Sequence, residues 1–123
     1  MAKSGEITGN FAGNRAGGGI YVENSGSASM RGGLISENSA NFGGGIFVHR
    51  NSTVIMTGGI ISRNNAGINR GGGVHVHDVS SSFAKRAAVG STTSGIIFGG
   101  TGADANIAGN GGHAVARFFG TLS

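Results

Sequence analysis

The feature that most constrains this chain is an internal repeat, in which three short blocks return in the same order. The first block reads GEITGN at 5–10. It returns as GLISEN at 33–38, as GIISRN at 59–64 and, more loosely, as GIIF at 95–98. Successive copies therefore begin 28, 26 and 36 residues apart. A unit of this length cannot bury its apolar face alone, so stacked copies are expected to share one core.

Two further blocks follow the first one in each repeat. The second is a glycine triplet with apolar residues after it: GGGIYV at 17–22, GGGIFV at 43–48, GGGVHV at 71–76 and a degenerate GGHAV at 111–115. The third holds a bulky side chain: SASMRG at 27–32, TVIMTG at 53–58 and SSF at 81–83. Apolar residues alternate within these blocks, which predicts short strands with one buried face.

Three strands per repeat predict an all-β fold, a parallel β-helix (β-solenoid) of about four coils with three short strands each. We expect a single domain over residues 1–123. The coils are expected at about 5–32, 33–58, 59–94 and 95–123. The offset of 36 residues predicts an insertion near 85–94, which is either a tolerated surface loop or part of a functional side. No capping segment is evident at either end of the predicted stack.

Equivalent residues of successive coils should lie directly over one another. Asn10, Asn38 and Asn64 share one turn position, and we expect them to form an asparagine ladder. The glycine triplets should mark sharp bends with little room for a side chain. The expected inward columns are Ile7/Ile35/Ile61/Ile97, Ile20/Ile46/Val74, Val22/Val48/Val76 and Met30/Met56/Phe83.

Alternation then predicts which side chains face outward. Leu34, Ile60 and Ile96 form an apolar column that is a contact surface, a strip covered by a terminal segment, or the product of a register shifted by one residue. A second outward column, Tyr21, Phe47 and His75, should stack its rings. Flat ring columns can bind sugars or pack against another molecule.

Histidines and carboxylates near this ring column are candidate metal ligands. His49, His75 and His77, with Glu23 and Asp78 nearby, have the side chains of a divalent-metal site. A flat sheet rarely brings four ligands to one point. We therefore expect a surface ladder here, and no metal and no cofactor.

Composition argues against several classes of function. The chain has five carboxylates, four histidines and no cysteine, and the carboxylates do not fall into one column, so we expect no catalytic residues and no enzyme activity. The net charge of +4 comes from scattered basic residues, which predicts no nucleic-acid partner. No run of about 18 apolar residues exists, so we expect no membrane insertion.

The segments ISENSA at 35–40 and GGGIFV at 43–48 resemble the glycine-rich repeats of bacterial adhesin-like surface proteins. More distantly, they are similar to the passenger repeats of chlamydial polymorphic outer-membrane proteins. The resemblance extends over about residues 5–84 and more loosely over 95–118. It implies a right-handed β-helix that is exported and displayed outside the cell or on its surface. It carries no catalytic residues.

Three functions follow as expectations. The first is a structural protein that stacks on itself, end to end or laterally through Leu34, Ile60 and Ile96, into a filament or array. The alternative is a fragment of an adhesin that binds glycan or host protein along Tyr21, Phe47 and His75. A carbohydrate-active enzyme is the weaker alternative.

Overall fold

The computed structural model describes residues 5–67, 71–78 and 80–85, together with the strand positions 96–97, 107–108, 115–117 and 121–122. These residues form strands, turns and bends but no helix, and so no helix among them is long and apolar enough to cross a membrane. The first repeat holds β1 (Glu6–Thr8), β2 (Ile20–Val22) and β3 (Ser27–Met30). The second holds β4 (Leu34–Ser36), β5 (Ile46–Val48) and β6 (Thr53–Met56).

The third repeat adds a short fourth strand to this pattern. It holds β7 (Ile60–Ser62), β8 (Asn65–Ala66), β9 (Val74–Val76) and β10 (Ser82–Lys85). The strands that follow are β11 (Ile96–Ile97), β12 (Ile107–Ala108), β13 (Val115–Arg117) and β14 (Thr121–Leu122). Lys85 belongs to β10, and residues 86–94 of the predicted insertion lie outside the described residues.

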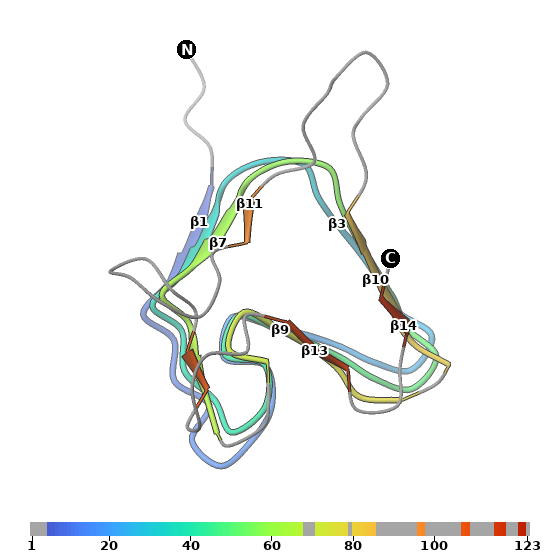
Figure 1. Cartoon of the computed structure of the whole chain (residues 1–123), viewed down its shortest axis with the longest axis horizontal. Helices are drawn as coiled ribbons and strands as arrows, with labels where there is room; N and C mark the ends of the chain where they lie inside the picture. The colour runs from blue at the N-terminus through green and yellow to red at the C-terminus, as the bar shows by residue number, and fades with distance from the viewer. Residues whose placement is uncertain are drawn as a thin grey trace.

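Every strand pairs in parallel with its counterpart one repeat away. The sheets run in the orders β1-β4-β7-β11, β2-β5-β9-β13 and β3-β6-β10-β14, and β8 pairs with β12. Figure 1 shows the chain following one closed path repeatedly, so that successive passes overlie one another. Parallel sheets connected in this way confirm the all-β expectation and are compatible with a β-solenoid.

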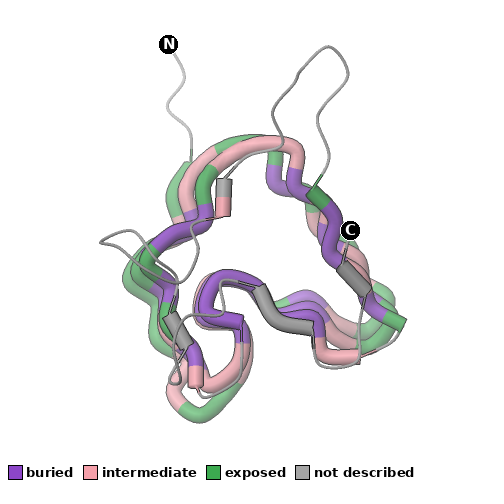
Figure 2. The backbone as a smooth tube through the Cα atoms, in the orientation of Figure 1, coloured by how far each residue is buried: buried purple, intermediate pink, exposed green. Residues whose placement is uncertain are grey.

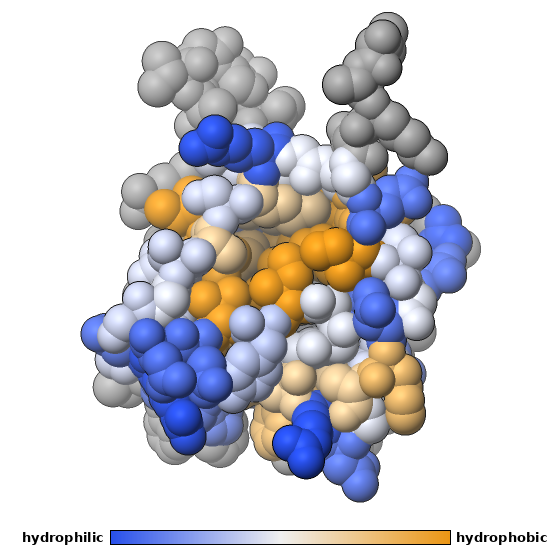
Figure 3. All heavy atoms as spheres, turned by 180° about the vertical axis from the view of Figure 1, so that it is seen from behind, coloured by the Kyte–Doolittle hydropathy of each residue, from blue (hydrophilic) through white to orange (hydrophobic). Residues whose placement is uncertain are grey.

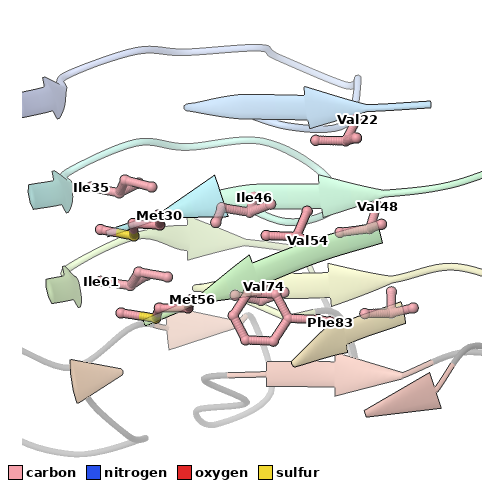
Figure 4. Packing of buried hydrophobic residues seen from close by; sticks show 11 residues of the cluster. Val22, Met30, Ile35, Ile46, Val48, Val54, Met56, Ile61, Val74 and Phe83 are labelled. Atoms are coloured by element: carbon pink, nitrogen blue, oxygen red, sulfur yellow. The ribbon is translucent and has the colours of Figure 1, made fainter. Parts of the chain in front are cut away.

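The predicted inward columns meet in register inside this path. Ile7 pairs with Ile35, Ile35 with Ile61, and Ile61 with Ile97. The columns that begin at Ile20 and Val22 also align as expected. Their members in the second and third repeats are buried. Figure 2 shows buried stretches of the backbone lying over one another in successive passes. Figure 4 shows Ile35 above Ile61 and Met30 above Met56, so like side chains fill one continuous core.

One column differs from the prediction. Met30 pairs with Met56, but Phe83 pairs with Val54, and Lys85 is the residue opposite Met56. The predicted place of Phe83 over Met56 is therefore wrong by two residues. Side chains two residues apart on a strand point to the same face of the sheet. Phe83 therefore still points inward, and it is buried.

The segment between the first and second strands of each repeat, which we call the return loop, covers residues 9–19 in the first repeat and 37–45 in the second. Bridges Phe11–Ser39 and Ala16–Phe42 hold these two loops in parallel register. Each loop ends in the glycine triplet, whose first glycine has positive φ, +68° at Gly17 and +56° at Gly43. The sharp bend predicted at the triplets is thereby confirmed, and it brings the loop back beside the second strand (Figure 1).

Candidate self-association surface

The ring column forms as predicted. The rings of Tyr21 and Phe47 stack with centroids 5.1 Å apart, and those of Phe47 and His75 stack with centroids 5.5 Å apart. The strands β2, β5 and β9 place the three rings one above the next, because each is the middle residue of its strand. Burial and the nearby Glu23 carboxylate, which accepts the Tyr21 hydroxyl hydrogen bond, raise the pKa of Tyr21.

The exposure predicted for this column is wrong for two of its three members. Tyr21 is 45% exposed, but Phe47 is 4% and His75 only 1% exposed. The cover is Phe42 of the return loop, whose ring lies 6.0 Å from that of Phe47 and 5.4 Å from that of His75, edge to face in both cases. Of this column, only Tyr21 is therefore exposed enough to contact another molecule.

Tyr21 remains exposed because its own repeat has no such cover. The residue that bridges Phe42 in the first repeat is Ala16, which has no ring to lay over Tyr21. Sequence reasoning overlooked Phe42, although its place directly before the triplet Gly43–Gly45 was a usable signal. A large apolar side chain at a bend that folds back over a sheet is expected to pack against that sheet.

The histidines beside this column make pairwise contacts. The Gly71 N–H donates to His75 Nδ1 at 3.4 Å, and His75 Nε2 lies 3.4 Å from His77 Nδ1. His49 Nε2 lies 3.6 Å from the Asp78 carboxylate. Over the ranges that the structure describes, no three histidine or acidic side chains converge as a metal site requires.

The apolar outward column on the first sheet is in register as predicted. Glu6 pairs with Leu34, Leu34 with Ile60, and Ile60 with Ile96. Ile60 is 37% exposed and Leu34 is partly exposed, so the described part of the column is a narrow apolar strip. The side chain of Ile96 lies outside the described residues.

The asparagine ladder also forms as predicted. The Asn10 side-chain amide donates to Asn38 Oδ1, and the Asn38 amide donates to Asn64 Oδ1, both at 3.0 Å. Each of these oxygens also accepts the backbone N–H of the asparagine one repeat earlier, again at 3.0 Å. Asn38 and Asn64 are fully buried, so these bonds satisfy polar groups that water cannot reach.

The remaining candidate surface is the end of the stack formed by the first repeat. The strands β1, β2 and β3 are each the outermost strand of their sheet, with no strand paired beyond them in the part of the chain described. Between them lies a hollow of about 290 Å³, lined by apolar side chains that include Ile7, Ile20 and Met30. Figure 3 shows apolar residues gathered in the middle of the molecular face and hydrophilic ones around them. An apolar centre flanked by unpaired strands has the composition of a coil-to-coil interface.

Comparison of the chain with protein-family models, with curated proteins and with solved structures finds no match.

Proposed function

We propose that this chain is a structural, non-enzymatic protein that self-assembles end to end into a filament, as a right-handed β-solenoid of about four coils. The observation that carries the proposal is the shared position of β1, β2 and β3, which among the described residues form three unpaired sheet edges at one end of the stack. The resemblance to exported repeat proteins supports an extracellular or cell-surface location for such a filament.

The unpaired edges direct backbone hydrogen-bonding groups outward. Within a parallel sheet, each residue directs its N–H and C=O to the same side, and successive residues alternate. The Thr53 N–H donates to Gly26 C=O and the Thr57 N–H donates to Met30 C=O, so the residues between them that face away from β6 are Ser27 and Ser29. The same argument from the bonds of β1 and β2 adds three more residues to the open edge: Glu6, Thr8 and Tyr21.

A second copy of the chain has the matching end. The same three sheets terminate in β11, β13 and β14 on the opposite side, and all their strands run in parallel. Translation of one copy along the stack would therefore bring β11 over β1, β13 over β2 and β14 over β3. A head-to-tail contact joins two different surfaces and has no twofold symmetry, so a dimer still has a free surface at each end. Further copies can therefore add, and the product is an open chain.

Docking would also bury the apolar hollow. Ile7 and Ile20 are only partly buried at the open end, whereas Ile35 and Ile46, their counterparts one repeat inward, are buried. Removal of apolar surface from water contributes about 25 cal/mol per Å². The same side chains that hold the repeats together would thus hold two copies together.

Sedimentation velocity over a concentration series, with electron microscopy of the same samples, tests the proposal. The wild type should form chains whose mean length grows with concentration, and a protein that stays monomeric at the highest soluble concentration would overturn it. Ser29→Pro removes an N–H from the open edge and should block assembly at unchanged secondary structure, because edge positions tolerate proline. Ser29→Ala keeps the N–H and is the matched control.

A lateral assembly through the apolar strip is the second candidate, since Ile60 is 37% exposed. Ile60→Lys separates the two modes. This variant places a charge in the apolar strip, so lateral packing should be lost. End-to-end stacking should proceed as in the wild type. Assembly abolished by Ile60→Lys and unaffected by Ser29→Pro would exclude the end-to-end mode.

A further inference from the structure

His75 lies in a ring cluster that it forms with Phe42, Phe47 and His77. Its side chain is only 1% exposed. Its ring stacks on that of Phe47 at 5.5 Å, and the Phe42 ring meets it edge to face at 5.4 Å. A positive charge on this imidazole would lose its hydration between two apolar rings. The neutral form of His75 is therefore the form that this cluster favours.

Both ring nitrogens of His75 lie within hydrogen-bonding distance of a neighbour. The Gly71 N–H donates to Nδ1 at 3.4 Å, so Nδ1 carries no proton. The proton of the neutral ring is therefore on Nε2, which lies 3.4 Å from His77 Nδ1 and donates to it. His77 Nδ1 is then an acceptor, and the proton of the neutral His77 ring is on Nε2. One arrangement of protons thus satisfies both contacts.

An added proton disrupts this arrangement on either ring. On His75 it must bind Nδ1, where it opposes the Gly71 N–H. On His77 it must also bind Nδ1, where it opposes the Nε2–H of His75. A transfer of the His75 proton from Nε2 to Nδ1 relieves that second clash only by creating the first. Each proton that these two histidines take up therefore removes a hydrogen bond and adds a charge.

We propose that His75 and His77, the histidine pair, form a pH-sensitive switch that closes the ring cluster when neutral and opens it when protonated. Gly71 is the first residue of the third glycine triplet, so its contact with His75 ties this triplet to β9. Loss of that contact, together with a charge beneath Phe42, favours an open cluster in which Phe47 is exposed. The switch does not depend on assembly, because all of these groups belong to the second and third repeats of one copy.

His49 and Asp78 are the ionisable groups that the described structure places beside the histidine pair. His49 follows β5, and its ring centroid lies 4.7 Å from that of His77. The Asp78 carboxylate lies 3.6 Å from His49 Nε2 and can pair with a proton there, whereas a charge on His49 opposes a second one on His77. Glu23 and Arg50, in the turns after β2 and β5, pair with each other at 3.4 Å. The remaining neighbours carry no ionisable side chain: Phe42, Phe47, Gly71 and, on β13, Ala116, which pairs with His75.

The switch predicts how stability depends on pH. In an unfolded chain a histidine takes up a proton below its ordinary pKa of about 6.5. The folded protein resists this at the histidine pair, so the unfolded state binds more protons and stability falls as the pH falls through that value. One resisted proton makes the equilibrium constant of unfolding about tenfold larger at pH 5.5 than at pH 7.5. The Asp78 carboxyl has a lowered pKa and titrates in a more acidic range, so its effect is separate.

Urea unfolding of the wild type at pH 7.5 and 5.5 measures this change, and hydrogen exchange of the Gly71 amide measures the opening of the cluster. Bonds that do not involve the histidine pair hold the third triplet to the second repeat. The Gly45 N–H donates to the Gly72 carbonyl at 3.0 Å, and the Ile46 N–H donates to the Gly73 carbonyl at 2.8 Å. We therefore expect Gly71 to exchange through a local opening. Its opening constant should also rise about tenfold at pH 5.5, once the intrinsic exchange rate is taken into account.

Two variants assign the pH dependence to its residues. His75→Phe removes the titrating ring and keeps an aromatic side chain in the column, as Phe47 does in β5. Its unfolding constant should change by less than about threefold between the two pH values. His49→Gln is the matched control, because it removes a neighbouring histidine and leaves the pair in place. This variant should keep the tenfold change of the wild type.

Four outcomes would overturn the inference. They are a wild-type unfolding constant that is equal at the two pH values, a His75→Phe variant that responds as the wild type does, a His49→Gln variant that has lost the response, and a Gly71 amide that exchanges only by global unfolding. Circular dichroism establishes that each variant is folded. Should His75→Phe fail to fold, the wild-type measurements and His49→Gln still decide.

Discussion

Phe47 and His75 stack with their ring planes only 3° apart, and the Phe42 ring closes over both of them. The molecule therefore has a second apolar layer outside the strands β5 and β9, in addition to the core inside the closed path. This layer depends on the return loop, because its cover comes from there. The loops are thus part of the packed structure and not solvated connections.

Phe42→Ala tests this outer layer. The substitution removes the ring from Phe47, His75 and His77, and we expect the free energy of unfolding to fall by about 2 kcal/mol. Urea denaturation monitored by circular dichroism measures the change. Phe11→Ala is the matched control, since Phe11 is 80% exposed, and it should change stability by no more than about 0.5 kcal/mol. Equal losses in the two variants would contradict a covering role for Phe42.

Asn38→Ala tests the centre of the ladder. Asn38 accepts two N–H groups from Asn10 and donates to Ile7 and Asn64, all in or near the interior. Deletion of its side chain removes these four hydrogen bonds from a largely buried site, so we expect a loss of about 3 kcal/mol in the free energy of unfolding. Thermal and urea unfolding give the measurement. Asn14→Ala, at an exposed turn position, should leave both transitions in place, and a comparable shift there would argue against the ladder as the cause.

Gly44→Ala tests the close approach of the return loops. A Cβ at Gly44 would overlap the carbonyl oxygen of Asn65 and lie 2.7 Å from the carbonyl oxygen of Gly72, both backbone atoms of the next repeat. Such atoms cannot move without separating the loops, so we expect a loss of about 3 kcal/mol. Gly5→Ala, where a Cβ meets nothing within 4 Å, should be close to neutral. The midpoints of urea unfolding of the two variants provide the comparison. A Gly44→Ala variant as stable as the wild type would mean that the return loops of successive repeats lie farther apart.

The aligned columns and the ladder could be predicted from the sequence because both depend only on repeat spacing and alternation. Once Ile35 is placed over Ile7, every residue in the same strand follows, and Asn38 necessarily lies by Asn10. The physical origin is the parallel register, which a chain whose blocks return in the same order satisfies in each pass.

Two features could not be obtained in this way. The cover by Phe42 depends on the path of the return loop, which positive φ at Gly43 sets and which alternation does not encode. The third block ends at Phe83 in its third copy, and alignment of the block ends predicts Phe83 over Met56. In the structure Ser82 pairs with Thr53, and this register places Phe83 over Val54.

The Asp78 carboxylate offers a test of stability against pH. It accepts the Arg50 backbone N–H at 2.6 Å and the Ser80 hydroxyl at 3.2 Å, and His49 lies beside it. Partial burial raises the pKa of Asp78, but the hydrogen bonds from Ser81, Arg50 and Ser80, together with His49, outweigh burial and hold the pKa below its ordinary value. The carboxylate thus joins two successive turns, since Arg50 and Asp78 belong to consecutive repeats.

A carboxyl with a lowered pKa stabilises the fold above its unfolded-state value of about 3.9 and loses that contribution as the pH falls through the folded-state value. We therefore expect the wild type to be more stable than Asp78→Asn at pH 6, and the difference to shrink as the pH falls below about 4. Urea unfolding of both proteins over this range measures it. The wild type at low pH is the control, because a protonated Asp78 carboxyl is neutral, as is the amide of the Asp78→Asn variant. A difference between the two proteins that stays constant down to low pH would mean that Asp78 acts through its shape and not through its charge.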